Sequence, residues 1–404
     1  MTKKVMLATA AIVSLISGST NTADAETDSA TVQRVSAWSP SMTIGGPDFT
    51  DRTLRMVVHP SVGGAALRVH LSNLRGTTPL AVGAVNLALQ ADKATAVAGS
   101  GRAVTFSHAK TLTIPAGQEV VSDPVPLPVR AEQNLLVSLY LPQATSSATW
   151  HSDAFDVSYL SKPGDFAADT EDGNYVAATT SWYYLSGLDV VSAAARGTVV
   201  AFGDSITDGY NTPASAYRRW PDDLARRLAG PHPSAVVDAG IGGNRVLTDV
   251  PNIWQGVSAL KRFAHDALAQ PGVRTVILLE GINDIGNNAG PGGVPLTAQH
   301  LIDGYRELIR QAHAAGVRII GATMLSDKGS GGYSEHGESI RQAANAWIRT
   351  GGQFDGVVDF DQATQDPPDP GALRAGFDSG DHIHPNEAGM QAMADAVDLR
   401  LLNR

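Results

Sequence analysis

Residues 198–209 read TVVAFGDSITDG, an apolar run that ends in a polar turn. The run Val199–Phe202 is short and apolar and is closed by Gly203, so it predicts a buried strand. Four further runs of the same kind lie downstream, at Ala235–Ala239, Thr275–Leu279, Arg318–Ala322 and Gly356–Phe360. The second half of the chain is therefore expected to contain five strands.

Helical patterns separate these runs, at Pro221–Leu228, Thr297–Ala315 and Glu338–Thr350. Two Gly- and Pro-rich stretches, Gly286–Pro295 and Asp366–Gly376, predict loops. Strands that alternate with helices predict a parallel sheet with helices on both faces. Five such strands favour a flavodoxin-like, doubly wound α/β domain. In this type of fold the functional groups lie beyond the carboxyl ends of the strands.

The preceding part of the chain, from about Val32 to Ala195, has a different pattern. Apolar and polar residues alternate with a period of two, as in Leu67-Arg68-Val69-His70-Leu71. The segments are short, end at turn sequences and show no long helical period. We expect an all-β, sandwich-like domain over residues 32–195, followed by the α/β domain over residues 196–404. No long linker separates the two, so they are expected to pack together.

The first residues have the pattern of a secretory signal peptide. Lys3 and Lys4 precede the apolar run Val5–Ile16, and a polar stretch ends in Ala23-Asp24-Ala25, a small-x-small cleavage pattern. We expect residues 1–25 to be removed, so that the mature protein begins near Glu26 and is periplasmic or extracellular. The alternative is an uncleaved anchor, although the run is short for a membrane span.

The composition excludes several classes of function. The 404 residues include no cysteine, which excludes a disulfide framework, thiol chemistry and cysteine-bound zinc. The formal charge of −10, from 30 basic and 40 acidic residues, argues against nucleic-acid binding, which needs a basic face. We therefore expect a globular protein with no nucleic-acid partner and no stable membrane anchor.

Four polar motifs follow or accompany the predicted strands of the second half. They are Gly203-Asp204-Ser205, Gly240–Asn244, Gly281–Asp284 and Asp381–Pro385. A serine nucleophile needs a base, a carboxylate that orients the base and donors for the oxyanion. The four motifs supply a serine, a histidine, an aspartate, glycine amides and an asparagine amide, in loops that meet at one edge of the sheet.

Taken in order, the four motifs resemble the blocks of the SGNH, or GDSL-type, hydrolases. The resemblance covers roughly residues 198–402 and implies that Ser205 is the nucleophile, His384 the base and Asp381 the carboxylate that orients it. The amides of Ser205 and Gly243 and the side chain of Asn283 would surround the oxyanion. The β domain ahead of the hydrolase domain is similar to that of a secreted subgroup.

Other polar residues admit a functional and a structural interpretation. His382 and His384 could be read as a metal pair, but no third ligand is evident, and we expect neither a metal nor a cofactor. Asp204 and Asp284 are expected to be hydrogen-bonding groups rather than catalysts. Three further histidines are expected at the surface, namely His265, His300 and His313.

Several aromatic side chains are candidates for substrate contacts. Trp254, Tyr333 and His336 are expected in loops at the carboxyl ends of strands, where they would line an acyl or sugar pocket or else pack internally. Four aromatic residues near the end of the β domain could form a platform that stacks against sugars, although packing in the core or between domains is favoured. They are Trp150, Trp182, Tyr183 and Tyr184. The β domain is accordingly expected to be structural.

These observations predict a secreted serine esterase that hydrolyses short acyl esters, with acetyl groups on polysaccharides as one substrate class. Two alternatives stay open. The first is a broad carboxylesterase or lipase that acts on small esters or lipids. The second is a carbohydrate-binding protein whose α/β half is inactive, against which the complete set of catalytic residue types argues. The oligomeric state does not follow from the sequence.

Overall fold

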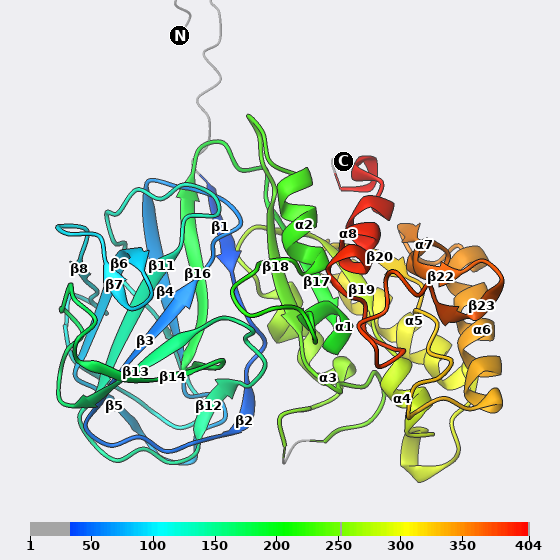
Figure 1. Ribbon diagram of the computed structural model, residues 1–404, viewed down its shortest axis with the longest axis horizontal. Helices are drawn as coiled ribbons and strands as arrows, with labels where there is room; N and C mark the ends of the chain where they lie inside the picture. Colours follow the sequence, from blue (N-terminus) through cyan, green and yellow to red (C-terminus); the bar gives the residue numbers. More distant parts are fainter. Residues whose placement is uncertain (1–32, 251–252, 403–404) are drawn as a thin grey trace, which may run out of the picture. The chain divides into compact units, whose positions relative to one another are not determined.

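Five parallel strands form the central sheet of the C-terminal region in the computed structural model, which describes residues 33–250 and 253–402 (Figure 1). Their order across the sheet is β18, β17, β19, β20 and β21. The bounds are Thr198–Gly203 for β17, Ala235–Gly240 for β18, Val273–Leu279 for β19, Arg318–Ala322 for β20 and Gly356–Val358 for β21. The first strand lies inside the sheet, between the second and the third, so the predicted doubly wound arrangement is confirmed.

Helices cover both faces of this sheet. The helices that pack on the two faces are α2 (Trp220–Arg227), α3 (Ala259–Phe263), α5 (Ala298–Ala314), α6 (Glu335–Thr350) and α8 (Glu387–Ala396). Alternate residues of β17 face opposite cores: Val200 and Phe202 share one with α3, α5 and α6, and Val199 and Ala201 share the other with α2 and α8. A strand buried on both sides has no polar face, which explains the continuous apolar runs of the sequence.

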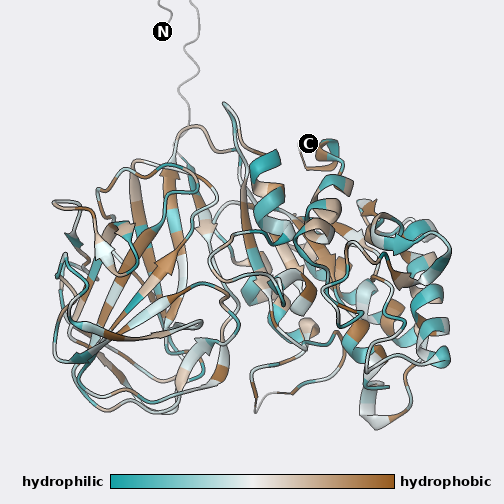
Figure 2. Cartoon of the chain, in the orientation of Figure 1, coloured by the Kyte–Doolittle hydropathy of each residue, from teal (hydrophilic) through white to brown (hydrophobic). Residues whose placement is uncertain are grey.

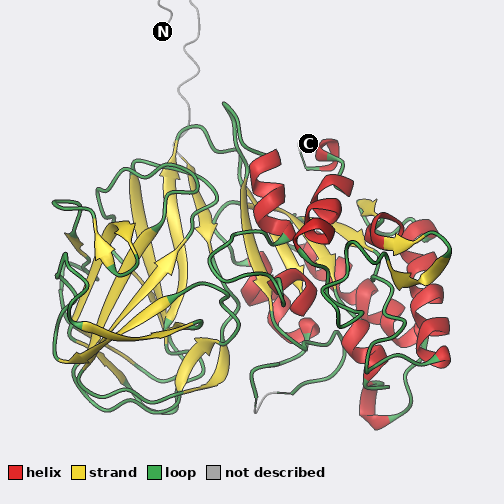
Figure 3. Cartoon of the chain, in the orientation of Figure 1, coloured by secondary structure: helices red, strands yellow, loops and turns green. Residues whose placement is uncertain are grey.

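Short helices complete the region, as Figure 3 shows in red. They are α1 (Ser205–Asp208), α4 (Ile282–Gly286), α7 (Phe360–Thr364), the π-helical turn η1 (Ala264–Leu268) and the 3₁₀ turns η2 (Pro291–Gly293) and η3 (Leu399–Leu401). Among the described residues, helices occur only after the start of α1, which agrees with the change of pattern in the sequence.

Several elements begin or end one to three residues away from the predicted positions, and the predicted loop 286–295 contains the turn η2. The last strand ends at Val358 rather than at Phe360, because Asp359 accepts a hydrogen bond from the amide of Gln362 and begins α7. Helix α6 begins at Glu335, three residues early, because the Ser334 hydroxyl caps it. The stretch predicted as the loop 366–376 contains most of a small hairpin, β22 (Gln365–Asp366) with β23 (Asp369–Leu373).

The N-terminal region consists of antiparallel strands. Its sheets have the orders β1-β16-β4-β10, β14-β13-β3-β11-β6-β7 with β8 on β6, β15-β12-β2 and β5-β9. The bounds are β1 (Gln33–Trp38), β2 (Thr43–Gly46), β3 (Arg52–Val58), β4 (Ala66–Ser72), β5 (Leu80–Val82), β6 (Ala84–Asp92), β7 (Thr95–Ala96), β8 (Arg102–Ala103), β9 (Leu112–Ile114), β10 (Glu119–Val121), β11 (Leu135–Leu141), β12 (Ala148–His151), β13 (Ser158–Pro163), β14 (Tyr175–Thr179), β15 (Trp182–Tyr183) and β16 (Leu185–Ser192).

One continuous apolar core lies between these sheets, and it explains the period of two. Leu67, Val69 and Leu71 of β4 are fully buried, whereas the residues between them are partly exposed. Strand β11 departs from the alternation because it is central, paired with both β3 and β6, and Leu136 on its outer face packs in a second, smaller core. Figure 2 shows the apolar residues in brown along the strands of both regions.

The two regions pack against each other. Only five residues, 193–197, connect β16 to β17. The amide of Ser36 in β1 donates to the Thr198 hydroxyl at the start of β17, at 3.1 Å. Residues 32–404 accordingly form one compact unit. The predicted signal peptide, residues 1–25, lies outside the described residues, and no described helix is long and apolar enough to cross a membrane.

Candidate active site

The candidate nucleophile lies at the point where β17 passes into α1. Asp204 is the N-cap of this short helix, and its carboxylate accepts from the amide of Ile206 at 3.0 Å. Gly203 must be a glycine, because a Cβ there would lie 2.2 Å from the Thr207 hydroxyl and 2.4 Å from the carbonyl of Leu279. The turn therefore holds Ser205 at the carboxyl end of β17, the edge at which ligands bind in such sheets.

Ser205, His384 and Asp381 form a continuous hydrogen-bonded chain. The distance from Ser205 Oγ to His384 Nε2 is 2.8 Å, and that from His384 Nδ1 to Asp381 Oδ2 is 2.6 Å. Because a carboxylate only accepts, Nδ1 carries the ring proton, and Nε2 is free to accept from the serine hydroxyl. This is the geometry that general-base activation of a hydroxyl requires.

The carboxylate of Asp381 is held by several donors. Its Oδ1 accepts from the amides of Ile383 and His384, and its Oδ2 also accepts from the Asn211 side chain at 2.8 Å. Burial raises the pKa of Asp381, but the hydrogen bonds from His384 and Ile383 outweigh burial and lower that pKa overall. The carboxylate thus stays ionised beside the imidazole.

The neighbouring His382 does not share this arrangement. Its Nδ1 bonds to Asp378 at 2.6 Å, and about half of its side chain is exposed, whereas His384 faces Ser205. The two rings therefore serve different partners. Among the described residues, no group of three or more His, Asp or Glu side chains has the arrangement of a metal site.

The predicted oxyanion donors come from the loops after β18 and β19. Gly243 has a left-handed backbone (φ of 72°), and a Cβ there would overlap the Gln255 side chain, so this position requires glycine. Asn283 lies in the first turn of α4 and donates from Nδ2 to Asp204 Oδ2 at 3.3 Å. Asp204 thus joins the Asn283 amide to the turn that carries Ser205.

A buried arginine not singled out by the sequence ties these loops together. Arg262 of α3 is 2% exposed and donates to the carbonyls of Gly203 and Ala239 at the ends of β17 and β18. It also contacts Glu280 and Asp266, each at 3.3 Å. In the sequence, only the position of Glu280 directly before the Gly281–Asp284 motif could have indicated this cluster. Arg262 lies in no motif and could not have been identified.

Burial makes the carboxyls under the site weak acids. It raises the pKa of Asp204 to about 7, and it raises the pKa of Glu280 well above its ordinary value. It likewise raises the pKa of Asp284 to about 7, although that carboxylate accepts from the amides of Val246 and Leu247. Asp204 and Asp284 make the structural hydrogen bonds expected of them.

Aromatic and polar side chains from both regions surround the site. The Tyr210 ring lies 4.7 Å from the His384 ring, and Phe155 of the β region meets Tyr210 edge-on at 5.9 Å. Asp153 of the same β-region loop lies so close to Gly242 that a Cβ there would be 2.9 Å from the carboxylate. The β region therefore contributes to the surroundings of the candidate oxyanion loop.

The other aromatic candidates fall into two groups. Trp254 is 47% exposed in the loop after β18, and Tyr333 is partly exposed, whereas His336 lies in α6 and not in a loop as predicted. Three of the four residues considered for a sugar platform are buried in the β-region core, and the fourth packs against it: Trp182, Tyr183, Tyr184 and Trp150. These four residues pack internally.

The surface histidines are each paired with a neighbour. His265 bonds to Asp266 and to Glu119 of β10, and His313 bonds to Asp355. The side chain of His300 accepts from the amide of Thr297 at the start of α5. All three are partly or largely exposed, and none takes part in the Ser205 chain of hydrogen bonds.

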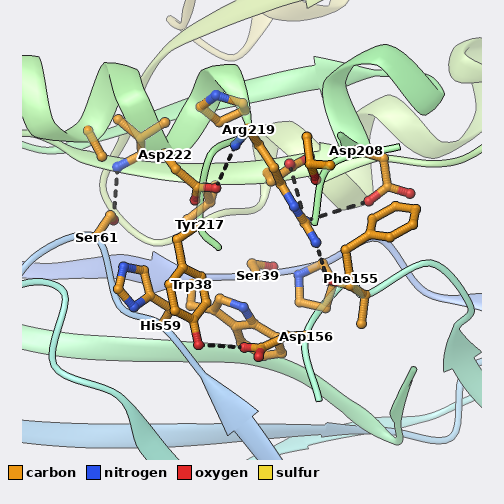
Figure 4. A pocket seen from close by; sticks show the side chains of 18 of the residues that line it. Trp38, Ser39, His59, Ser61, Phe155, Asp156, Asp208, Tyr217, Arg219 and Asp222 are labelled. Carbon is orange, nitrogen blue, oxygen red and sulfur yellow. Dashed lines mark hydrogen bonds and ion pairs between the residues drawn. The ribbon is translucent and has the colours of Figure 1, made fainter. Parts of the chain in front are cut away.

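A cavity of about 50 Å³ lies between the two regions (Figure 4). Its lining includes aromatic rings such as Trp38 and Tyr217 and charged groups such as Asp156, Arg219 and Asp208. The Asp156 carboxylate is satisfied inside the protein, since it accepts from Ser215 and Tyr217, whereas Asp208 Oδ2 has no partner among the described residues. None of Ser205, His384 and Asp381 lines this cavity, so it is distinct from the candidate active site.

Comparison with known proteins assigns the C-terminal region. Residues 201–392 match the GDSL-like lipase/acylhydrolase family. A search of curated proteins finds no match. Among solved structures, the chain is similar to a GDSL-like lipase from Bacteroides thetaiotaomicron (19% identity, TM-score 0.39, 51% of this chain and 88% of that one). It is also similar to a carbohydrate acetylesterase family member from Sinorhizobium meliloti (15% identity, TM-score 0.40, 52% of this chain and 100% of that one).

The family match agrees with the four motifs and with the five-stranded sheet that carries them. An acylhydrolase cleaves the bond between an acyl group and its alcohol with water, so the alternative of a protein that only binds carbohydrate is set aside. By its motifs, its fold and its family match, the C-terminal region of the chain, residues 201–392, is a hydrolase domain of the SGNH/GDSL type and thus a carboxylic ester hydrolase domain.

Proposed function

We propose that the protein is a secreted serine esterase that hydrolyses short-chain acyl esters, acetyl esters in particular, through Ser205, His384 and Asp381. The observation that carries the proposal is the chain of hydrogen bonds from Ser205 Oγ to His384 Nε2 (2.8 Å) and from His384 Nδ1 to Asp381 Oδ2 (2.6 Å). A serine hydroxyl paired in this way is activated for attack on a carbonyl.

The reaction proceeds through an acyl-enzyme. Ser205 Oγ attacks the ester carbonyl while His384 Nε2 takes its proton, and Asp381 stabilises the resulting imidazolium. The amides of Ser205 and Gly243 and the Asn283 side chain bind the oxyanion. The tetrahedral intermediate expels the alcohol, which takes the proton from His384. Water, deprotonated by His384, then cleaves the acyl-enzyme and releases the acid.

The polar surroundings of the oxyanion loop support a small acyl group. The Gln255 side chain covers Gly243, and the Asp153 carboxylate lies against Gly242. Burying a long alkyl chain next to these groups would deprive them of water without replacing its hydrogen bonds. Hydroxyl-rich alcohols, such as the sugars of a polysaccharide, would instead offer donors to Asp153.

A substrate panel tests the proposal. Rates on p-nitrophenyl esters from acetate to palmitate, beside acetylated xylan and other acetylated polysaccharides, should be highest for acetate and fall with chain length. Ser205→Ala should abolish turnover on every substrate while its circular dichroism and melting temperature stay close to those of the wild type. More than a small percentage of turnover left in Ser205→Ala would refute Ser205 as the nucleophile.

A broad carboxylesterase or lipase is the second candidate function. Exposed apolar side chains at the loops near the site favour it: Tyr210 is 41% and Trp254 is 47% exposed. Exposed aromatic surface next to a site suits an apolar substrate. If the hydrolysis rate is highest for hexanoate or a longer acyl chain, and no acetate is released from polysaccharide, the second function is favoured over the first.

Export is part of the proposal and rests on residues 1–25. If the signal peptide is cleaved, the protein outside the cytoplasm begins at or near Glu26. Intact-mass measurement of the secreted fraction decides this, because a membrane-bound product that starts at Met1 would mean an uncleaved anchor. We also propose that residues 32–195 and 196–404 are two domains, with the first a structural partner of the second.

A further inference from the structure

A buried histidine of the β region contacts the helix that carries the candidate nucleophile. His151, the last residue of β12, is 3% exposed. Its Nδ1 lies 2.8 Å from the carbonyl of Ser41, and its Nε2 lies 3.0 Å from Asp208 Oδ1. Both partners only accept hydrogen bonds, so both ring nitrogens must donate. His151 is therefore an imidazolium, a buried positive charge at the junction of the two regions.

The partner of this charge is the last residue of α1, the helix that begins with Ser205. The amide of Asp208 donates to the carbonyl of Asp204 at 2.9 Å, so one helical turn joins the two ends. On its other side the helix touches β18, since a Cβ on Gly240 would lie 2.4 Å from the Asp208 nitrogen. A shift of Asp208 would thus move the turn that holds Ser205.

Few other groups hold the Asp208 carboxylate. Its Oδ2 has no hydrogen-bond partner among the described residues, and Asp208 lines the cavity between the regions (Figure 4). Arg219 Nη1 is 3.7 Å from Asp208 Oδ1, and the same nitrogen is 3.5 Å from Asp238. His151 makes the shorter contact, and among the described residues it has no second carboxylate at hydrogen-bonding distance, whereas Arg219 contacts both Asp208 and Asp238.

We propose that His151 is a positioning residue for the esterase reaction: its charged ring fixes Asp208 and, through α1, sets the place of Ser205. This inference rests on the proposed function, in which Ser205 is the nucleophile. It adds one specific contact to the structural role of the β region, because the position of the nucleophile depends on His151. A nucleophile displaced by about 1 Å can cost about 10²-fold in rate.

Matched variants separate positioning from stability. His151→Gln keeps one donor but loses the charge. His70→Gln breaks another His–Asp pair, with Asp189 at 2.7 Å inside the β region. Glu132→Gln breaks an ion pair between the regions, with Arg226 of α2 at 2.8 Å. We expect kcat of His151→Gln to fall about 10- to 100-fold with KM within about twofold. Both controls should keep kcat within about twofold of the wild type.

A covalent probe reads the position of the serine directly. Diethyl p-nitrophenyl phosphate should phosphorylate Ser205 in the full-length enzyme, with loss of p-nitrophenolate, and the rate in His151→Gln should fall by the same factor as kcat. If the wild type is not labelled at Ser205, the proposed function fails. If Ser205 is labelled and His151→Gln reacts as fast as the two controls, the positioning inference alone is wrong.

The dependence of the labelling rate on pH tests the charge of His151. Burial lowers the pKa of His151, but the charge and hydrogen bond of Asp208 outweigh burial and raise that pKa to about 9. The other charged groups that face this pair are Arg219, Asp153 and Asp238. We expect the labelling rate to fall as the pH rises through about 9, and this fall to be absent in His151→Gln. A rate that stays level to pH 10 in the wild type would overturn the inference.

Discussion

Each region buries at least one arginine, and Arg55 of the β region differs in its partners from Arg262 of the α/β region. In the β region, Arg55 donates to the carbonyls of Ala94 and Asp169 and to the Ser138 hydroxyl, and no carboxylate among the described residues lies at hydrogen-bonding distance from it. In the α/β region, Arg262 binds strand-end carbonyls and also contacts Glu280 and Asp266. The first arginine ties loops to a strand, and the second holds a charged cluster beneath the candidate active site.

This difference shows how the two architectures use polar groups. The carboxyl ends of parallel strands meet at one edge of a sheet, so loops distant in sequence bring charged and catalytic groups together there. Antiparallel strands send their ends to both edges, and the polar groups of the β region mostly satisfy backbone atoms. The contribution of the β region to chemistry is expected to come from the few side chains that cross to the other region.

The largest effect short of removing Ser205 is expected in the α/β region at Asp381. Asp381→Asn keeps the shape of the side chain but favours the wrong imidazole tautomer, so turnover should fall about 10⁴-fold. Steady-state kinetics on p-nitrophenyl acetate measure this. A mild loss, with His384→Ala still severe, would mean that a backbone carbonyl rather than Asp381 orients His384.

Asn283→Ala should have the next largest effect. It removes one donor to the oxyanion, so kcat should fall about 10²- to 10³-fold with little change in KM. It also leaves the Asp204 Oδ2 atom without the Asn283 amide. Unchanged kcat would mean that the Ser205 and Gly243 amides hold the oxyanion without Asn283.

The two arginines test the comparison itself. Arg262→Met leaves Glu280 and Asp266 without this partner in the core, so we expect a loss of about 3–5 kcal/mol in unfolding free energy and a fall in kcat. Arg55→Met leaves neutral acceptors unsatisfied, at a cost of about 1–3 kcal/mol for each one that stays buried, and should keep kcat within about twofold. Urea unfolding and kinetics on the same preparations measure both. Equal losses of kcat would contradict the division of roles between the regions.

The smallest effect concerns the dependence of stability on pH at His265, which bridges the regions through Glu119. The hydrogen bonds that the His265 ring donates to Asp266 and Glu119 raise the pKa of His265 to about 10. Because this pKa is raised on folding, protonated His265 stabilises the folded state. Its contribution to the unfolding free energy is complete below the pKa of the unfolded state, near 6.5, and is lost as the pH rises through about 10. The melting temperature should drop by a few degrees more between pH 7 and 10 in the wild type than in His265→Gln. The same dependence of melting temperature on pH in both proteins would mean that the hydrogen bonds of His265 add nothing to stability.

Much of the architecture could be predicted because it follows from local patterns. Continuous apolar runs marked the strands of the central sheet, and alternation marked strands such as β4. The boundaries that differed were set by capping side chains, Asp359 and Ser334, whose effect depends on the conformation of the turn before the helix. The candidate triad was predictable because its residues lie in short motifs, and the structure has them within hydrogen-bonding distance.

The sequence by itself determined the class of fold, the order of the strands along the chain and the residue types of the candidate site. Only the tertiary structure decided the long-range pairs. His151 and Asp208 are 57 residues apart, and Ser41 and Arg262 are 221 residues apart, so no local pattern joins them. Such pairs form because two independently patterned regions pack at one interface, where the cost of burying a charge is offset only by a partner that the fold brings close.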